Sequence, residues 1–326
     1  MTKANIPPLK FRPILKSAIW GGEKIAPFKG IATDQKQIGE SWEISGVKGN
    51  ESVVDNGPDA GLTLTQMIEK YGAELVGEKN IARFGATFPL LVKIIDAAGD
   101  LSVQVHPDDE LAQQRHNSLG KTEMWYIVDV DPGAEICAGL AKEIDADEYV
   151  ARVADNSLPS VLAHHESHPG DVFFLPAGRI HSIGAGNLLV EVQETSDITY
   201  RIYDFGRVDA ATGKPRQLHV EEARDAIDYT VYPDYVTKAG EEVDGVSELV
   251  TCGHFSVQRL SFTGEAKQFA PEADSFTTFT CTEGELTVTD TVGNSVKLVK
   301  GESMLIPANI GQYTVEGVGT VVRARN

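Results

Sequence analysis

The chain of 326 residues carries 48 acidic against 29 basic residues, which gives a formal net charge of −19. A hydrophobic fraction of 41% and a charged fraction of 24% are those of an ordinary globular protein and exclude a largely disordered one. So strong a negative field repels nucleic acid and anionic membrane surfaces, and we expect neither as a partner. An anionic substrate would therefore need a local group of cations that opposes the charge of the whole chain.

The N-terminal segment and the cysteines both favour a cytoplasmic protein. Residues 1–20 carry cations but no uninterrupted apolar core, so we expect neither a signal peptide nor a membrane anchor. No later window approaches the roughly 18 apolar residues that a membrane-spanning helix needs. Cys137, Cys252 and Cys281 are far apart and form no CxxC pair, so we expect free thiols in a reducing compartment.

Short β-rich segments dominate the first two hundred residues. Each is rich in Val, Ile, Phe or Leu and is bounded by Gly, Pro or Asp. They span residues 89–97, 101–107, 123–130, 171–178 and 187–195. Many short strands with this punctuation favour a β-barrel or a double-sheet jelly roll.

Four helical patterns fall between these strands. They cover about residues 62–80, 107–118, 141–156 and 219–229. In the first, Leu64, Met67 and Ile68 share one face, and either Thr63 or Thr65 can cap the N-terminus. We interpret all four as helical insertions in or beside a β scaffold.

The pattern changes near residue 230, where the helices stop and strands continue to the end of the chain. A phrase of the form G-[DE]-x-x-x-[IL]-P-A occurs within residues 168–183 and again within 299–315. This repeat predicts two related β domains, a catalytic one over residues 1–230 and a plain one over 231–326. The second copy has Gln312 near the position of His181 in the first, so only the first domain is expected to hold a metal.

Two polar residues interrupt an otherwise apolar strand. Gln104 and His106 are one residue apart, so their side chains point to one face while Val103 and Val105 point to the other. Burying an unsatisfied amide or imidazole costs about 1–3 kcal/mol, so a polar pair inside a barrel needs a partner such as a bound cation. An exposed polar face explains this stretch equally well when it is taken alone.

The same spacing recurs at the start of the next strand, in Lys121 and Glu123. Taken alone, this pair fits a solvated ion pair, and His181, which follows an apolar strand and a turn, fits a structural histidine. Together with Gln104 and His106 they form the pattern Q-x-H, E and H on successive strands. Four such positions in one barrel favour a metal site.

This pattern resembles the metal site of the cupin superfamily, where the usual arrangement is H-x-H, a Glu and a distant His. The wider similarity is to class I phosphomannose isomerases, in particular their short bacterial form, and it runs from about residue 10 to 230. It rests on WGG (20–22), GESWEIS (39–45), FPLLVKIIDA (88–97), LSVQVHPDDELA (101–112), GKTEMWYI (120–127) and PAGRIHSIGAGNLLVEVQETSDITYRIYDFGR (176–207). The resemblance implies two cupin (jelly-roll β-barrel) domains, the first with helical insertions and the second without a metal site.

In that family Gln, His, Glu and His bind one zinc ion, and by resemblance these ligands are Gln104, His106, Glu123 and His181. The donor set agrees with a catalytic metal, because one carboxylate and no thiolate leave Zn²⁺ with a net charge near +1. Iron, cobalt or manganese suit similar donors, so zinc rests on the resemblance.

The resemblance further implies that the chain interconverts mannose 6-phosphate and fructose 6-phosphate through an enediol. The sequence does not fix the oligomeric state, and we expect a monomer or a homodimer. The resemblance places an active-site arginine at Arg201, in the segment SDITYR. Strand alternation directs Lys121 into the same cavity as Glu123. We expect both cations to act catalytically, as partners of the phosphate or of a developing oxyanion.

Four further residues are candidates for substrate binding. We expect Trp20 to form a wall at the mouth of the cavity, with Glu43 beneath it. Glu191 is expected to contact sugar hydroxyls or to support a metal ligand, and Asp197 to orient Arg201. A metal-bound water, Lys121 and a carboxylate all stay open as the group that transfers the proton.

Two other classes of protein fit parts of this pattern. A cupin dioxygenase with iron normally leaves a three-ligand face open for oxygen, whereas four protein ligands leave less room. A non-catalytic sugar-binding cupin would keep the barrel and lose the site, whereas all the ligands and both cations are present here. The isomerase is therefore the preferred hypothesis.

Overall fold

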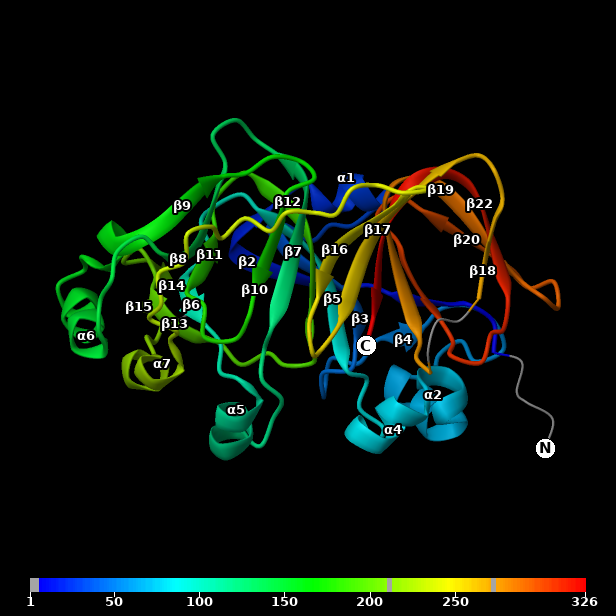
Figure 1. Cartoon of the computed structure of the whole chain (residues 1–326), viewed down its shortest axis with the longest axis horizontal. Helices are drawn as coiled ribbons and strands as arrows, with labels where there is room; N and C mark the ends of the chain where they lie inside the picture. The colour runs from blue at the N-terminus through cyan, green and yellow to red at the C-terminus, as the bar shows by residue number, and fades with distance from the viewer. Residues whose placement is uncertain (1–5, 210–212, 271–273) are drawn as a thin grey trace.

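The computed structural model describes residues 6–209, 213–270 and 274–326. Two β-rich lobes lie side by side along the long axis of the molecule (Figure 1). The expectation of a mainly β chain is confirmed. Within the described residues, no helix combines the length and the apolar character that crossing a bilayer requires.

Two antiparallel sheets make the first lobe. One has, in spatial order, β10 (Val172–Leu175), β7 (Glu123–Val130), β12 (Asn187–Glu194), β5 (Leu90–Ala97), β2 (Ile14–Gly22) and β3 (Ile38–Ser45). The other has β13 (Tyr200–Tyr203), β6 (Val103–Val105), β11 (His181–Ile183), β8 (Glu135–Leu140) and β9 (Leu162–Glu166). Trp125 and Phe173 of the first sheet pack with Ile136 and Ile183 of the second in one buried core. The inner faces of the two sheets therefore enclose the interior of this lobe.

Helices cover the outer face of the five-stranded sheet. Val103 and Val105 of β6 pack there against Tyr149 of α6 (Ala146–Ala154) and Ala223 of α7 (Val220–Ala226). Because strand side chains alternate, Gln104 is left on the inner face, as its spacing predicted.

The second lobe is a nine-stranded sheet that includes strands from both ends of the chain. Its main path is β16 (Val246–Thr251), β17 (Ser256–Thr263), β22 (Tyr313–Arg325), β19 (Thr277–Asp290), β21 (Ser303–Ile306), β1 (Leu9–Arg12) and β4 (Val53–Val54). β18 (Lys267–Phe269) pairs with β22, and β20 (Ser295–Val299) pairs with β19. Leu9 of β1 lies opposite Leu305 of β21. A division into two domains at residue 230 stays a prediction, and this sheet crosses it.

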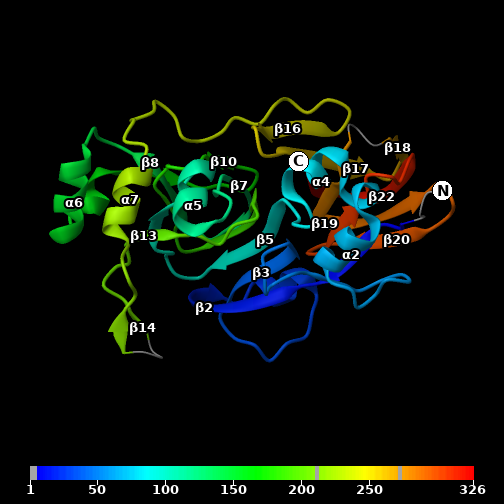
Figure 2. The same ribbon diagram turned by 90° about the horizontal axis from the view of Figure 1, so that it is seen from below.

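The remaining elements lie mostly between the strands. Residues 62–80 contain α2 (Leu64–Tyr71), α3 (Ala73–Val76) and the start of α4 (Glu78–Phe84), and residues 107–118 contain α5 (Asp109–His116). The sequence did not anticipate α1 (Ile25–Lys29) or the 3-10 helix η1 (Leu158–Val161). Thr63 caps α2, since its hydroxyl accepts from the backbone of Gln66 while the Gln66 side chain accepts from the backbone of Thr63. The hairpin β14 (Val208–Asp209) and β15 (Lys214–Pro215) projects from the first lobe (Figure 2).

A continuous hydrophobic core joins the two lobes. Phe88, just before β5, and Phe276, just before β19, are both fully buried, and their ring centroids are 4.4 Å apart. The same core extends from Ile94 of the first lobe to Leu305 of the second. The lobes are therefore packed against each other through apolar side chains.

Truncating one ring of this core should destabilise the whole chain. We expect Phe276→Ala to lower the free energy of unfolding by about 3–5 kcal/mol, because it removes buried apolar surface and leaves a cavity. Denaturant unfolding followed by circular dichroism measures the change. Val318→Ala is the control, because Val318 is 63% exposed and its truncation should change stability by about 0.5 kcal/mol or less. Equal losses in the two variants would contradict a shared core.

Candidate metal centre and adjoining cavity

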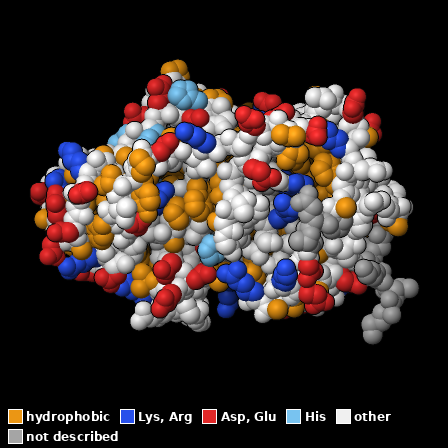
Figure 3. All heavy atoms as spheres, viewed as in Figure 1, with side chains coloured by type: hydrophobic (Ala, Val, Ile, Leu, Met, Phe, Trp, Pro, Cys, Tyr) orange, Lys and Arg blue, Asp and Glu red, His pale blue; other side chains and the backbone are white. Residues whose placement is uncertain are grey.

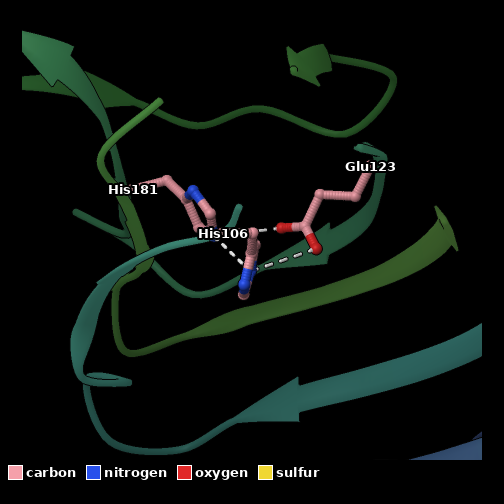
Figure 4. Close-up of side chains that lie close together, drawn as sticks. All are labelled: His106, Glu123 and His181. Carbon is pink, nitrogen blue, oxygen red and sulfur yellow. Dashed lines mark hydrogen bonds and ion pairs between the residues drawn. The ribbon is translucent and has the colours of Figure 1, made fainter. Parts of the chain in front are cut away.

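The residues predicted as metal ligands come from both sheets of the first lobe. His181 begins β11 and pairs directly with Gln104 of β6, and His106 follows β6 by one residue. Glu123 begins β7 in the opposite sheet. The ligand atoms of His106, Glu123 and His181 all lie within 4.8 Å of one another (Figure 4). The fold thus brings together four residues from three separate segments of the sequence.

The distances within this cluster are short. The Nε2 atoms of His106 and His181 are 3.2 Å apart. Oε1 of Glu123 lies 3.1 Å from Nε2 of His181, and Oε2 lies 3.6 Å from Nε2 of His106. The amide nitrogen of Gln104 lies 3.3 Å from Nε2 of His181. A half-turn of that amide group presents its oxygen, the atom that can ligate a cation, at the same place.

Hydrogen bonds fix the orientation of both imidazoles. Nδ1 of His106 donates to the carbonyl of Ile198 at 2.8 Å, and Nδ1 of His181 donates to the carbonyl of Arg179 at 2.8 Å. A carbonyl only accepts, so each Nδ1 carries the proton and each Nε2 presents a lone pair to the cluster. This is the tautomer that a metal requires.

The carboxylate of Glu123 completes the fit to a cation. Both of its oxygens are buried without a well-aligned hydrogen bond from any described residue. The ammonium of Lys121 lies 2.8 Å from Oε2 and 3.0 Å from Nε2 of His106. Two imidazole lone pairs and two carboxylate oxygens that converge in a buried space repel one another, so the donor set fits a divalent metal.

The surroundings hold these groups in the protonation states needed for ligation. Burial, and then the ammonium of Lys121, keep the pKa of His106 well below its usual value, so the imidazole is neutral. Burial alone would raise the pKa of Glu123, but the ammonium of Lys121 holds it well below the usual range. The carboxylate is therefore ionised.

A cavity of about 210 Å³ lies beside this cluster. Its lining contains most of the residues predicted for the site, namely Trp20, Gln104, Lys121, Glu191, Asp197 and Arg201. It also contains polar and aromatic residues that sequence reasoning missed, namely Glu40, Trp42, Lys93, Ser102, Thr199 and Arg216. Glu40 and Trp42 lie in the GESWEIS segment, and the alternation along β3 was the one signal that could have identified them.

Glu43 lies outside this cavity, which corrects its expected place beneath Trp20. Because Glu40 and Trp42 face the cavity, strand alternation turns Glu43 to the opposite face of β3. There its carboxylate accepts from Nζ of Lys29 at 2.6 Å and from the hydroxyl of Ser41 at 2.5 Å. Glu43 and Lys29 are both buried, so Glu43 forms a structural ion pair.

Asp197 lines the cavity but does not act on Arg201 as expected. The guanidinium of Arg201 donates to the hydroxyl of Ser102 at 3.3 Å and to the carbonyl of Gln217 at 3.1 Å. Burial, and then the charge of Arg216, lower the pKa of Arg201, and the carboxylate that acts in the opposite direction is Asp204. Asp197 instead lies near Lys16, where burial lowers the pKa of the ammonium and the charge of Asp197 acts against that effect.

The cavity differs in charge from the chain as a whole. On the face in Figure 3, acidic and basic side chains are interspersed over both lobes. The cavity lining has four cations, Lys93, Lys121, Arg201 and Arg216, and three carboxylates, Glu40, Glu191 and Asp197. A local excess of cations in a chain of net charge −19 is what an anionic ligand requires.

Two carboxylates hold the backbone of the segment that leads into β7. Oδ1 of Asp109 accepts from the backbone N–H of Gly120 at 2.9 Å, and Oε2 of Glu194 accepts from that of Thr122 at 2.8 Å. His254, from the second lobe, lies with Nδ1 2.8 Å from Oε1 of Glu194. The second lobe thereby supports the segment that carries Lys121 and Glu123.

This contact between the lobes predicts a pH-dependent stability. The hydrogen bond to Glu194 raises the pKa of His254 above 6.5. Its contribution to folding is therefore complete below pH 6.5 and is lost as the pH rises through the raised pKa. We expect the difference in melting temperature between the wild type and His254→Gln to shrink from pH 6 to pH 9, measured by scanning calorimetry. A difference that does not change with pH would contradict the charged contact.

Comparisons with known proteins agree over nearly the whole chain. Residues 9–130 match the family of the phosphomannose isomerase type I catalytic domain, and residues 246–326 match the mannose-6-phosphate isomerase cupin domain. Mannose-6-phosphate isomerase ManA of Bacillus subtilis is 37% identical over 95% of this chain and 96% of that protein. Mannose-6-phosphate isomerase of Streptococcus mutans is 32% identical over 95% of each.

A crystal structure gives the same result for the fold. The crystal structure of the mannose 6-phosphate isomerase from Bacillus subtilis superposes on this chain with a TM-score of 0.88 and 31% sequence identity. The superposition covers 98% of this chain and 99% of the Bacillus subtilis chain. The expected cupin fold is thereby confirmed. With matches in both halves of the sequence and over nearly its full length, the chain belongs to the type I phosphomannose isomerase (mannose-6-phosphate isomerase) family.

Proposed function

We propose that this chain is a zinc-dependent aldose–ketose isomerase that interconverts D-mannose 6-phosphate and D-fructose 6-phosphate. One observation carries the proposal, namely the convergence of His106, Glu123 and His181 beside a cavity with an excess of cations. Membership of the family and the names of the relatives support the reaction.

The proposed ligands of one zinc ion per chain are Gln104, His106, Glu123 and His181. The oriented Nε2 lone pairs and the buried carboxylate support this set. When bound there, zinc would act as a Lewis acid for the sugar oxygen that becomes negative during the reaction.

The cations of the chain itself suit the same chemistry. Isomerisation moves a proton between C2 and C1 through an enediol, and negative charge develops on a neighbouring oxygen. Lys121 is buried beside Glu123 at the cavity wall, so its N–H groups are held in place before that charge develops. Arg201 lines the same cavity with a guanidinium already positioned by Ser102 and Gln217. Glu191, which pairs with Lys93 at 2.8 Å, is positioned to contact sugar hydroxyls.

The proposed location is the cytoplasm, and the thiols of the chain are compatible with it. All three are free, and burial raises the pKa of Cys137 and of Cys281 to about 12. Such thiols stay protonated and are poor nucleophiles for disulfide formation.

A coupled assay tests the proposed reaction. Protein loaded with zinc should convert mannose 6-phosphate to fructose 6-phosphate, which glucose-6-phosphate isomerase and a dehydrogenase then turn into an absorbance signal. Omitting the protein, and omitting the sugar phosphate, are the controls. Oxygen consumption without isomerisation would point to the dioxygenase hypothesis, and sugar binding without either reaction to a binding protein. Both results would contradict the proposal.

A further inference from the structure

We propose that Arg216, together with Arg201, binds the phosphate group of the substrate at one end of the cavity. This assignment rests on the proposed function and deepens it, because it fixes which of the lining cations take the phosphate. Arg216 follows β15 of the projecting hairpin (Figure 2).

The two lysines of the cavity are already neutralised. Nζ of Lys93 lies 2.8 Å from Oε1 of Glu191, and the charge of Glu40 also stabilises the Lys93 ammonium. Nζ of Lys121 lies 2.8 Å from Oε2 of Glu123. Each ammonium is thus paired with a buried carboxylate of its own, so neither is left to balance the full charge of a phosphate group.

The arginine end is different. Arg201 donates to two neutral acceptors, the Ser102 hydroxyl and the Gln217 carbonyl. Nε of Arg216 donates to Oδ2 of Asp204 at 2.8 Å, but that single carboxylate is shared with Arg207, whose Nε donates to Oδ1 at 3.1 Å. The positive excess of the cavity is therefore concentrated at Arg201 and Arg216.

The electrostatics of Arg201 agree with this excess. Burial, and then the charge of Arg216, lower the pKa of its guanidinium, which means that each arginine disfavours the charge of the other. A phosphate monoester carries a charge of about −1.5 to −2 at pH 7 and would relieve that repulsion.

The geometry also suits a phosphate. Arg201 pairs across β13 and β6 with Gln104, so it lies next to the proposed metal centre. Arg216 lines the same cavity, and its hydrogen bonds to Asp204 through Nε and Nη2 hold its fork in a fixed orientation. A planar guanidinium held in this way is ordered before the anion arrives, so less entropy is lost on binding. The sugar would extend from the metal towards the hairpin.

Paired variants test the assignment on the zinc-loaded enzyme. We expect Arg216→Gln to raise both the KM for mannose 6-phosphate and the inhibition constant of inorganic phosphate about 10- to 100-fold, from the loss of a charged hydrogen bond. The kcat and the zinc content should change less than about twofold. Both constants of Arg216→Lys should lie between those of the wild type and those of Arg216→Gln, because lysine keeps the charge but loses the planar fork of donors.

Arg207→Gln is the matched control. Arg207 shares Asp204 with Arg216 but donates its other hydrogen bond to the carbonyl of Asp100 and does not line the cavity. Both constants should therefore stay within about threefold of the wild type. Unchanged constants in Arg216→Gln, equal effects in Arg207→Gln, or loss of zinc with loss of kcat would each overturn the assignment.

The same variants separate this assignment from the proposed function. Calorimetric titration with inorganic phosphate measures the site without any reaction. If the wild type binds phosphate, Arg216→Gln does not, and no isomerisation occurs in either, then the anion site stands and the isomerase proposal fails. If mannose 6-phosphate is isomerised equally well by both, the isomerase stands and the phosphate assignment fails.

Discussion

Replacing His181 by alanine should remove the metal and abolish isomerisation while the chain stays folded. His181 supplies one of the two oriented Nε2 lone pairs, so its loss leaves an incomplete set of donors. We expect metal affinity and kcat/KM to fall by more than about 100-fold, since losing even a group that only supports a ligand costs about 10- to 100-fold. Metal analysis after gel filtration and the coupled assay measure the two effects.

His181→Ala is a cleaner test than a change of Glu123. Removing the Glu123 charge would leave Lys121 buried without its carboxylate, which costs about 3–5 kcal/mol and obscures the effect on metal. Gln312→Ala is the control, because Gln312 is the sequence counterpart of His181 in the second repeat and is exposed. If His181→Ala kept one equivalent of metal and full activity, the ligand assignment would be wrong.

Replacing Arg201 by alanine should abolish activity and leave the metal in place. Its guanidinium lines the cavity but bonds to Ser102 and Gln217, which are not proposed ligands. Arg201 lies both at the proposed phosphate end of the cavity and next to the metal centre, so its loss removes a phosphate contact and a fixed donor near the developing negative charge. Losing one such donor costs about 100- to 1,000-fold in rate, and we expect kcat/KM to fall at least that far. The measurements are kcat/KM and zinc per chain in the same preparation.

Two comparisons make this result specific. Arg201→Lys keeps a cation but not the planar fork, so we expect it to recover only part of the activity. Arg201→Ala should melt within a few degrees of the wild type. Loss of zinc from Arg201→Ala would mean that the residue supports the metal centre rather than the substrate.

Alternation along single strands was the most reliable signal in the sequence. It correctly predicted that Gln104 faces the opposite side of its strand from Val103 and Val105. When the two valines pack against the helices outside the barrel, the side chain between them points into the interior. Along β3 the same alternation separates Glu43 from Trp42 and Glu40, which face the cavity, so the expected place of Glu43 beneath Trp20 is wrong. A carboxylate next to a tryptophan in the sequence lies on the opposite face of a strand.

Contacts made between distant segments were not accessible from the sequence. Arg216 follows a short hairpin, and only the fold brings it beside Arg201 and Asp204. His254 of the second lobe likewise contacts Glu194 of the first. Neither residue belongs to a periodic sequence pattern that would have indicated this contact. Such pairings depend on how the sheets pack, and a single sequence carries no local signal of them.

The N-terminal strands illustrate the same limit on domain boundaries. Leu9 and Lys10 pair with β21 of the C-terminal sheet, although the composition of the chain changes only near residue 230. A strand added to the edge of a distant sheet needs only a short apolar segment such as LKFR, which resembles many others. Composition therefore located the strands of the C-terminal segment, but not the N-terminal strands that pair with them in the same sheet.

Removal and return of the metal tests the central claim most directly. The protein is dialysed against a strong chelator, freed of the chelator, and assayed for conversion of mannose 6-phosphate while zinc is added in steps. We predict that activity falls to background and then rises in proportion to zinc, reaching its full value at one equivalent per chain. Full activity in metal-free protein would contradict the account.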